Sequence, residues 1–218
     1  MTQTRSNRLA ESLEEFRATR AHTLALAEVL SQSQFDHAPA RGGWSVGEVL
    51  DHMLLAEATN RGQIAKLIEL KRAGREAELR LTFSDVNVSV AYVPRSVLPL
   101  LSTPLTLINA FVPDCLRNYL TRNRLVPFQN PDVAAPRRRR PALRLREDLL
   151  ASLKETEALF QTNPNLDYGE MAVQHPLLGR YDVPGLLRFM SAHEQRHQSQ
   201  IADIVSDPQF PRTLSAVR

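Results

Sequence analysis

The sequence has almost no cysteine. Cys115 is the single cysteine among 218 residues, which excludes an intramolecular disulfide and any zinc site built on a cysteine cluster. A lone thiol fits a reducing compartment, and we expect a cytoplasmic protein. The first residues, as far as Phe16, contain no apolar stretch of the signal-peptide type, in keeping with that expectation.

An excess of one sign of charge is also largely missing. The formal net charge is +3, and much of the excess lies in one run, Arg137–Arg140. Binding of nucleic acid would favour aromatic residues interleaved with this run, and there are none. We therefore expect no nucleic-acid partner. The run is predicted to be a solvated loop, with recruitment of an anion as the alternative.

Long hydrophobic runs are limited to one stretch. The window from Val97 to Leu116 is about long enough to span a bilayer. Pro99, Pro104 and Pro113 interrupt it, and prolines in a lone span would leave backbone carbonyls unpaired in lipid. We expect a buried or interfacial segment, either a lid over a substrate pocket or a dimer contact, and no stable membrane insertion.

Four stretches have the three- and four-residue apolar spacing of amphipathic helices. They run from Asn7 to Ser31, from Trp44 to Ala73, from Leu143 to Gln161 and from Pro184 to Ser206. Between the second and third lies an insertion, Leu81 to Pro141, which holds eight of the fourteen prolines and, in Phe83–Tyr92, a short strand or an extended loop. The pattern predicts an all-α, four-helix bundle with a long central crossover, as one domain over residues 1–218.

Several residues have the chemistry that starts or ends a helix. Ser45 and Glu48 are spaced as a capping box at the start of the second helix, and Gly74 is a plausible end for it. Asp182 is a possible cap for the last helix, with Pro184 in its first turn. These residues predict boundaries that do not depend on the apolar pattern.

Two histidines lie on the apolar side of the last helix. His193 and His197 fall in one seam with Met190 and Ile201, and residues four apart on a helix lie one turn above each other on the same face. Two imidazoles in that relation can chelate one ion. Left without partners, each would cost about 1 to 3 kcal/mol, and a bound metal removes this cost.

His52 is the natural third ligand. It lies between Val49 and Met53 on the inward side of the second helix. Three neutral imidazoles suit zinc, nickel, cobalt or iron(II) and leave positions open, as catalytic metal sites do. We expect a divalent ion, zinc or nickel. The alternative is that these are satisfied core histidines without a metal.

The run from His193 to His197 also matches H-E-x-x-H, the zinc-protease signature in which Glu194 would be the base. No glutamate follows Glu194 to supply a third ligand, and Gln200 replaces the glycine that would turn the chain towards Asp203. We therefore set the protease interpretation aside. Glu194 and Asp51 are expected to be solvated helix-face charges or acceptors for imidazole N–H groups.

Three motifs in this order resemble the DinB-like superfamily. They are Trp44-Ser45-x-x-Glu48-Val49-Leu50-x-His52, then His175-Pro176-x-x-Gly179, predicted to be a loop, then His193-x-x-x-His197-x-x-Gln200-Ile201. The resemblance implies a four-helix bundle with a long crossover, a metal site on His52, His193 and His197, and a homodimer. Some members resemble thiol S-transferases that use low-molecular-weight thiols such as bacillithiol or mycothiol, and others a thiol-dependent isomerase.

The resemblance implies a metal-dependent enzyme acting on a small molecule, either a thiol S-transferase or a hydrolase. The insertion is longer and more apolar than in typical members, so the substrate is not carried over. Glu48, one turn before His52, is the first candidate for a catalytic base, and the capping box is its alternative role. The alternative functions are a non-catalytic metal-binding protein and a stress-response protein that binds a hydrophobic small molecule.

Overall fold

The computed structural model describes residues 2–40, 42–82, 89–90, 128–129, 135–175 and 179–212. This part of the chain is mainly helical, in agreement with the expected fold class. The stretch from Val97 to Leu116, most of the insertion, and Cys115 lie outside the described residues. Within Phe83–Tyr92, where a short strand or an extended loop was expected, Ser89–Val90 form strand β2, which pairs antiparallel with β3 (Phe128–Gln129).

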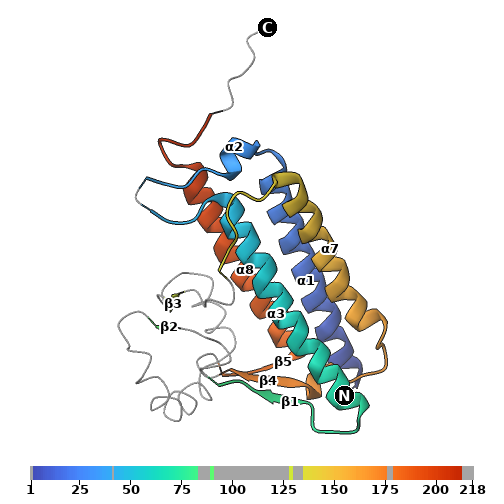
Figure 1. Cartoon of the computed structure of the whole chain (residues 1–218). Helices are drawn as coiled ribbons and strands as arrows, with labels where there is room; N and C mark the ends of the chain where they lie inside the picture. Colours follow the sequence, from blue (N-terminus) through green and yellow to red (C-terminus); the bar gives the residue numbers. More distant parts are fainter. Residues whose placement is uncertain are drawn as a thin grey trace.

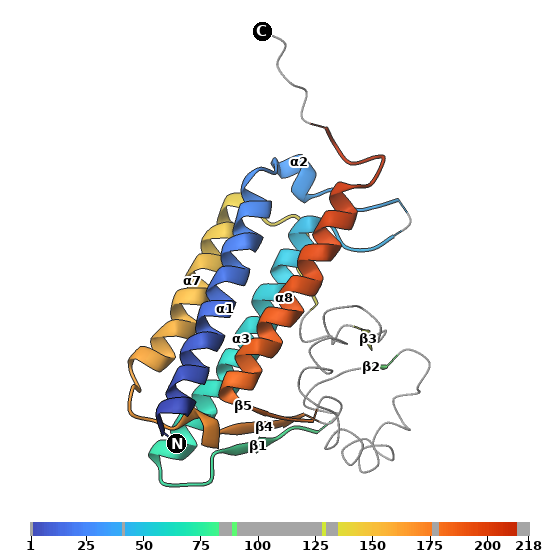
Figure 2. The same cartoon turned by 180° about the vertical axis from the view of Figure 1, so that it is seen from behind.

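Four long helices lie side by side (Figures 1 and 2). They are α1 (Thr2–Glu28), α3 (Val46–Arg72), α7 (Ala142–Gln161) and α8 (Val183–Val205). Helices α1 and α8 run in one direction and α3 and α7 in the other, and each of α1 and α3 packs against both α7 and α8. The short α2 (Gln32–Phe35) lies where α1 ends and α3 begins.

The helix boundaries follow the predicted caps. Ser45 Oγ accepts the N–H of Glu48 at 3.2 Å, and Glu48 Oε2 accepts the N–H of Ser45 at 2.9 Å, which confirms the capping box. Gly74 follows α3 with a φ of +67°, a conformation that favours glycine. Asp182 Oδ1 accepts the N–H of Gly185 at 2.8 Å and caps α8. The largest difference between the predicted and the observed helix boundaries is at the start of α1, which begins at Thr2 rather than at the expected Asn7.

A small sheet lies at the end of the helices where α3 ends and α8 begins (Figure 1). Its order is β1 (Glu78–Arg80), β4 (Ala172–His175), β5 (Gly179–Asp182), with β1 parallel and β5 antiparallel to β4. A single turn of 3₁₀ helix, η2 (Tyr168–Glu170), precedes β4. The expectation that His175 and Gly179 lie in a loop was wrong, because they end and begin paired strands.

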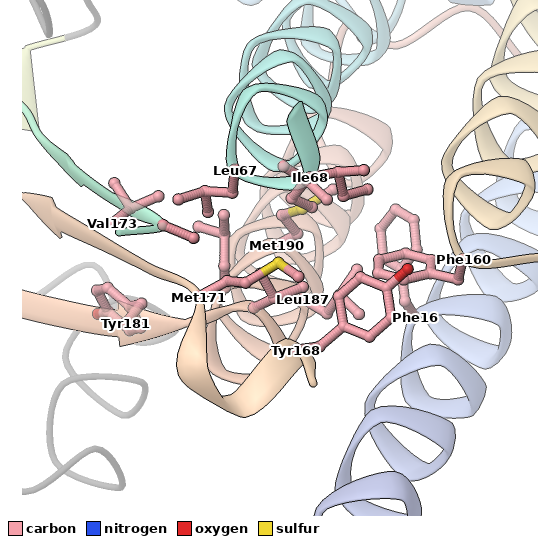
Figure 3. Packing of buried hydrophobic residues seen from close by; sticks show 14 residues of the cluster. Phe16, Leu67, Ile68, Phe160, Tyr168, Met171, Val173, Tyr181, Leu187 and Met190 are labelled. Atoms are coloured by element: carbon pink, nitrogen blue, oxygen red, sulfur yellow. The ribbon is translucent and has the colours of Figure 1, made fainter. Parts of the chain in front are cut away.

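The hydrophobic core is divided into two clusters. The first, which we call the sheet-end cluster, includes Phe16, Leu67, Phe160 and Leu187 (Figure 3). The second, the α2-end cluster, contains a set of fully buried side chains from the other end of the helices: Phe35, Val49, Leu50, Leu145, Leu149 and Ile201. Burying each large aliphatic or aromatic side chain stabilises the fold by about 1.5 to 3 kcal/mol.

Between the two clusters lies a polar layer, made of Arg20, Thr23, Glu57, Thr156 and Glu194. On each of the four long helices its residues fall between members of the sheet-end and α2-end clusters. The side chain of Arg20 is only 1% exposed, and its guanidinium donates to all three neighbouring helices. Its bonds are Nε to Glu194 Oε1 at 2.9 Å, Nη2 to Glu194 Oε2 at 2.9 Å, Nη2 to Glu57 Oε2 at 2.9 Å and Nη1 to Leu149 O at 2.7 Å.

The two carboxylates of the polar layer are also completed by hydroxyl groups. Thr23 donates to Glu194 Oε1 at 2.6 Å, and Thr156 donates to Glu57 Oε1 at 2.7 Å. Burial alone would lower the pKa of Arg20, but Glu194 and Glu57 outweigh it and raise that pKa. The layer therefore fixes the four helices to one another through charges that are matched inside the core.

Candidate metal centre

The three predicted histidines come together between α3 and α8. His52 lies in the first two turns of α3, and His193 and His197 lie one turn apart on α8. One nitrogen from each ring falls within 4.8 Å of the others, and they form the one candidate metal-binding group found among the described residues. His52 and His197 are buried and His193 is half-buried.

The two α8 imidazoles have the spacing of ligands to one ion. Their Nε2 atoms are 3.2 Å apart, whereas two nitrogens bound tetrahedrally to zinc would be about 3.3 Å apart for bonds of about 2.0 Å. The ring centroid of His52 is 5.3 Å from that of His193 and 4.8 Å from that of His197. The residues present therefore fit a single ion held by three imidazoles.

The protonation state also suits metal binding. Burial lowers the pKa of His193 well below its usual value, and the neighbouring His197 and His52 lower it further. The neutral imidazole is the form that binds a metal. At neutral pH His193 therefore presents a nitrogen lone pair rather than a positive charge.

Gln200 orients one of the ligands. Its Oε1 lies 2.9 Å from Nδ1 of His197, so this ring nitrogen carries the proton and Nε2 faces His193. Sequence reasoning missed this role, although it noted Gln200 as the residue that replaces a glycine and as part of the third motif. The signal was present, because residues three apart on a helix are neighbours.

Aromatic rings flank the three histidines. The ring of Trp44 lies 4.8 Å from that of His52 and 6.5 Å from that of His197, measured between centroids. Phe189 lies 6.2 Å from His193 and is nearly parallel to it. Trp44 is partly exposed and packs against the α2-end cluster. It is the only tryptophan of the chain, so its fluorescence reports on this centre.

Glu48 is buried beside the centre on α3. One carboxylate oxygen accepts the N–H of Ser45 in the capping box, and the other accepts from Nε of Arg138 at 3.1 Å. The structural role expected for Glu48 is thus present. Its role as a catalytic base stays a prediction.

The arginine run packs against the same part of α3. We call Arg137, Arg138 and Arg140 the arginine clasp. Asp51 is fully buried and accepts from the backbone N–H of Arg137 at 2.7 Å, from its Nη2 at 2.9 Å, and from Nη1 of Arg140 at 2.7 Å. Arg140 also pairs with Asp148 and is only 16% exposed, so the expectation of a solvated loop was wrong for this residue.

Arg140 is only partly exposed because the chain re-enters the helical part across α3, immediately before α7 (Figure 1). Burial of Asp51 opposes its ionisation, but the hydrogen bonds from Arg137 and Arg140 prevail and hold the pKa of Asp51 below its usual value. The buried carboxylate in turn fixes the clasp at the start of α3, beside His52 in the sequence.

Glu194 and Asp51 are not solvated, and neither accepts a proton from an imidazole among the described residues. Glu194 is 3% exposed and belongs to the polar layer. Asp51 belongs to the arginine clasp. Both expectations for these carboxylates were therefore wrong, because arginines from other parts of the chain donate to their oxygens.

The other histidines lie apart from the centre. His22 is exposed on α1, and His37 follows α2, where its ring packs edge-on against Phe210 at 5.4 Å. His175 ends β4, and burial lowers its pKa to about 4. None of the three joins His52 in the candidate group.

Among the helices that the structure describes, none combines the length and the apolar character needed to cross a membrane. The stretch from Val97 to Leu116 lies outside this search.

These features define a mainly helical protein with a three-histidine group that could hold a metal ion between two of its long helices. The chain belongs to the DinB superfamily, whose family model matches residues 15–201. The match includes the three histidines and the whole polar layer. No curated protein and no solved structure matches the chain.

Proposed function

We propose that the chain is a metal-dependent thiol S-transferase of the DinB superfamily. His52, His193 and His197 hold one divalent ion, zinc or nickel, and a low-molecular-weight thiol is one substrate. The observation that carries this proposal is the convergence of three imidazole nitrogens within 4.8 Å, in a chain of this superfamily. We also propose that the four long helices constitute the four-helix bundle of the family, in a single-domain cytoplasmic protein that forms a homodimer.

A bound divalent ion with open positions would lower the pKa of a coordinated thiol and bind its sulfur as a thiolate. Gln200 keeps Nε2 of His197 directed at this position. Glu48, which lies one turn from His52, receives the thiol proton. The sulfur then forms its bond to an electrophilic carbon of the second substrate, whose leaving group departs with the bonding electron pair.

The carboxylates near the centre favour thiol transfer over hydrolysis. Hydrolysis needs a base to remove a proton from water, but Glu48, Asp51 and Glu194 are each held by at least one arginine. A thiol loses its proton far more readily than water does, so it depends less on such a base. We therefore place the hydrolase second, as an outcome of the test.

Metal content is the first measurement. Protein purified without an affinity tag is analysed for bound metal, with His193→Ala as the test variant and His22→Ala, an exposed histidine on α1, as the matched control. We expect about one ion per chain in the wild type and in His22→Ala, with most of it lost in His193→Ala. Less than about 0.2 ions per chain, with His193→Ala unchanged in stability, contradicts the metal centre.

Turnover is measured with the metal-loaded protein, a low-molecular-weight thiol and 1-chloro-2,4-dinitrobenzene as the electrophile. Thiol-dependent conjugation that is lost in His193→Ala and kept in His22→Ala supports the transferase. Metal-dependent ester hydrolysis without any thiol dependence supports the hydrolase instead. A metal-loaded protein that does neither is a metal-binding protein without turnover.

A further inference from the structure

The described carboxylates beside the three-histidine centre are already paired with arginines. Three neutral imidazoles would leave the charge of a divalent ion uncompensated by its ligands. Among the described residues, the carboxylates nearest along the chain do not compensate it either, because Glu48 pairs with Arg138, Asp51 with Arg137 and Arg140, and Glu194 with Arg20. The loaded centre would thus carry a net positive charge that a ligand has to balance.

Arg138 stands next to this charge with most of its guanidinium in solvent. Its Nε is bonded to Glu48 Oε1 at 3.1 Å, and its side chain is 86% exposed. Glu48 is one helical turn from His52, and side chains four apart on a helix have Cβ atoms about 6 Å apart. The bond to Glu48 therefore fixes Nε of the guanidinium close to a metal ligand, while most of the side chain is exposed to solvent.

The stability of the arginine clasp does not explain why Arg138 pairs with Glu48. Asp51 is fully buried and is already satisfied by Arg137 and Arg140, whereas an ion pair whose arginine is as exposed as Arg138 contributes little to stability. An arginine fixed at one nitrogen and open at two others is suited to bidentate binding of an oxyanion.

We propose that the substrate of the three-histidine centre is an anion, whose carboxylate binds the guanidinium of Arg138 beside the metal position. This inference rests on the proposed function, because it describes the substrate of the same site. For a thiol substrate, the sulfur occupies the metal position while the carboxylate reaches Arg138. The thiol or its acceptor is thus selected by charge as well as by its reactive group.

The test uses two thiols of equal length that differ in charge. The cobalt(II)-loaded protein is titrated with 3-mercaptopropionate and with 3-mercaptopropan-1-ol. The thiolate-to-cobalt absorption band reports binding of the sulfur, and Trp44 fluorescence gives a second readout. The wild type is compared with Arg138→Gln, with Arg138→Lys, and with Arg144→Gln, a control arginine that is also exposed and locally paired.

We expect the wild type to bind the carboxylated thiol about tenfold more tightly than the alcohol, from one charge-assisted contact. The ratio falls to within about threefold in Arg138→Gln, is partly kept in Arg138→Lys, and is unchanged in Arg144→Gln. Equal affinity for both thiols in the wild type, or an unchanged preference in Arg138→Gln, overturns the proposal and leaves thiol binding standing.

A separate arm distinguishes this failure from failure of the proposed function. If neither thiol gives a cobalt band, thiol transfer is contradicted, and propionate binding then decides on the anion site. Propionate that binds the wild type, by calorimetry and Trp44 fluorescence, and is lost in Arg138→Gln supports it. Absence of propionate binding overturns it. Thermal unfolding and cobalt content of each variant establish that Arg138→Gln folds and loads, as its exposed side chain predicts.

Discussion

The polar layer and the three-histidine centre are neighbours in one helical core, but their buried polar groups are arranged in opposite ways. His193 and Glu194 are adjacent in the chain, yet Glu194 is matched by Arg20 and Thr23, whereas His193 faces the Nε2 atom of His197 at 3.2 Å. In the polar layer, charge is balanced within the protein. In the centre, neutral donors converge on one point, which is the arrangement of a ligand site rather than of a structural ion pair.

The largest expected effect comes from breaking the polar layer. Arg20→Met removes the cation and leaves Glu194 and Glu57 charged in the core. We expect a loss of about 3 to 5 kcal/mol in the free energy of unfolding, measured by urea denaturation, with or without metal. The control Arg144→Met, on the exposed face of α7, should change stability by less than about 0.5 kcal/mol.

A companion variant sharpens this prediction. Replacing the layer as a unit, with Arg20→Met, Glu57→Leu and Glu194→Leu together, removes the unpaired charges as well. We expect most of the lost stability to return, because apolar groups of similar volume can replace a buried ion network. A triple variant no more stable than Arg20→Met would show that the hydroxyl groups of Thr23 and Thr156, left without acceptors, dominate the cost.

The opposite pattern is expected for the centre. His193→Ala should leave the unfolding free energy of the metal-free protein within about 1 kcal/mol of the wild type. With zinc at one hundred times its dissociation constant, the wild type gains about 2.7 kcal/mol, and the variant should gain almost none of it. Equal stabilisation of both proteins by zinc would show that the ion binds elsewhere.

A half-buried histidine outside the centre gives a pH test. Burial lowers the pKa of His175 to about 4, against about 6.5 in the unfolded chain. Below pH 6.5 the unfolded state binds the proton and the folded state does not, so this residue's contribution is present above pH 6.5 and is lost as the pH falls towards 4.

Between pH 7.5 and pH 5 the contribution of His175 to the free energy of unfolding falls by about 2 kcal/mol. The variant His175→Gln should show a correspondingly shallower fall in unfolding free energy over this interval, followed by urea denaturation of the metal-free protein. The exposed His22 gives the matched variant His22→Gln, which should keep the wild-type slope. If the unfolding free energy fell equally with pH in all three proteins, the acid sensitivity would arise from groups other than His175.

The comparison also shows how far the sequence could predict the molecule. The four helices and the histidine seam could be predicted, because each depends on spacing within one helix. The polar layer left a signal that was overlooked: Arg20 lies four residues after Phe16 and four before Leu24, inside the apolar stripe of α1. A charge in that position indicates a buried partner on another helix.

Other features had no local signal. Strands β1 and β4 pair in parallel although they are distant in the chain, and strands of three and four residues show too little alternation to predict such a pairing. The clasp on Asp51 depends on where the chain returns before α7. Such contacts are decided by tertiary packing and not by the spacing of neighbouring residues.

The smallest expected effect concerns the orientation of one ring in the centre. Gln200→Ala removes the acceptor that lies 2.9 Å from Nδ1 of His197, so this ring can turn and Nε2 is no longer fixed towards His193. Loss of a hydrogen bond to a metal-binding histidine typically weakens metal affinity by about tenfold or more. Competition with a chelator, followed through Trp44 fluorescence, measures this change.

Gln200→Glu should restore or exceed the wild-type affinity, because a carboxylate is a stronger acceptor for the same N–H. Unaltered zinc affinity in Gln200→Ala would mean that the packing of Trp44 against His197 alone positions the ring. The centre would then resemble the polar layer, being fixed from within the fold rather than prepared for an ion.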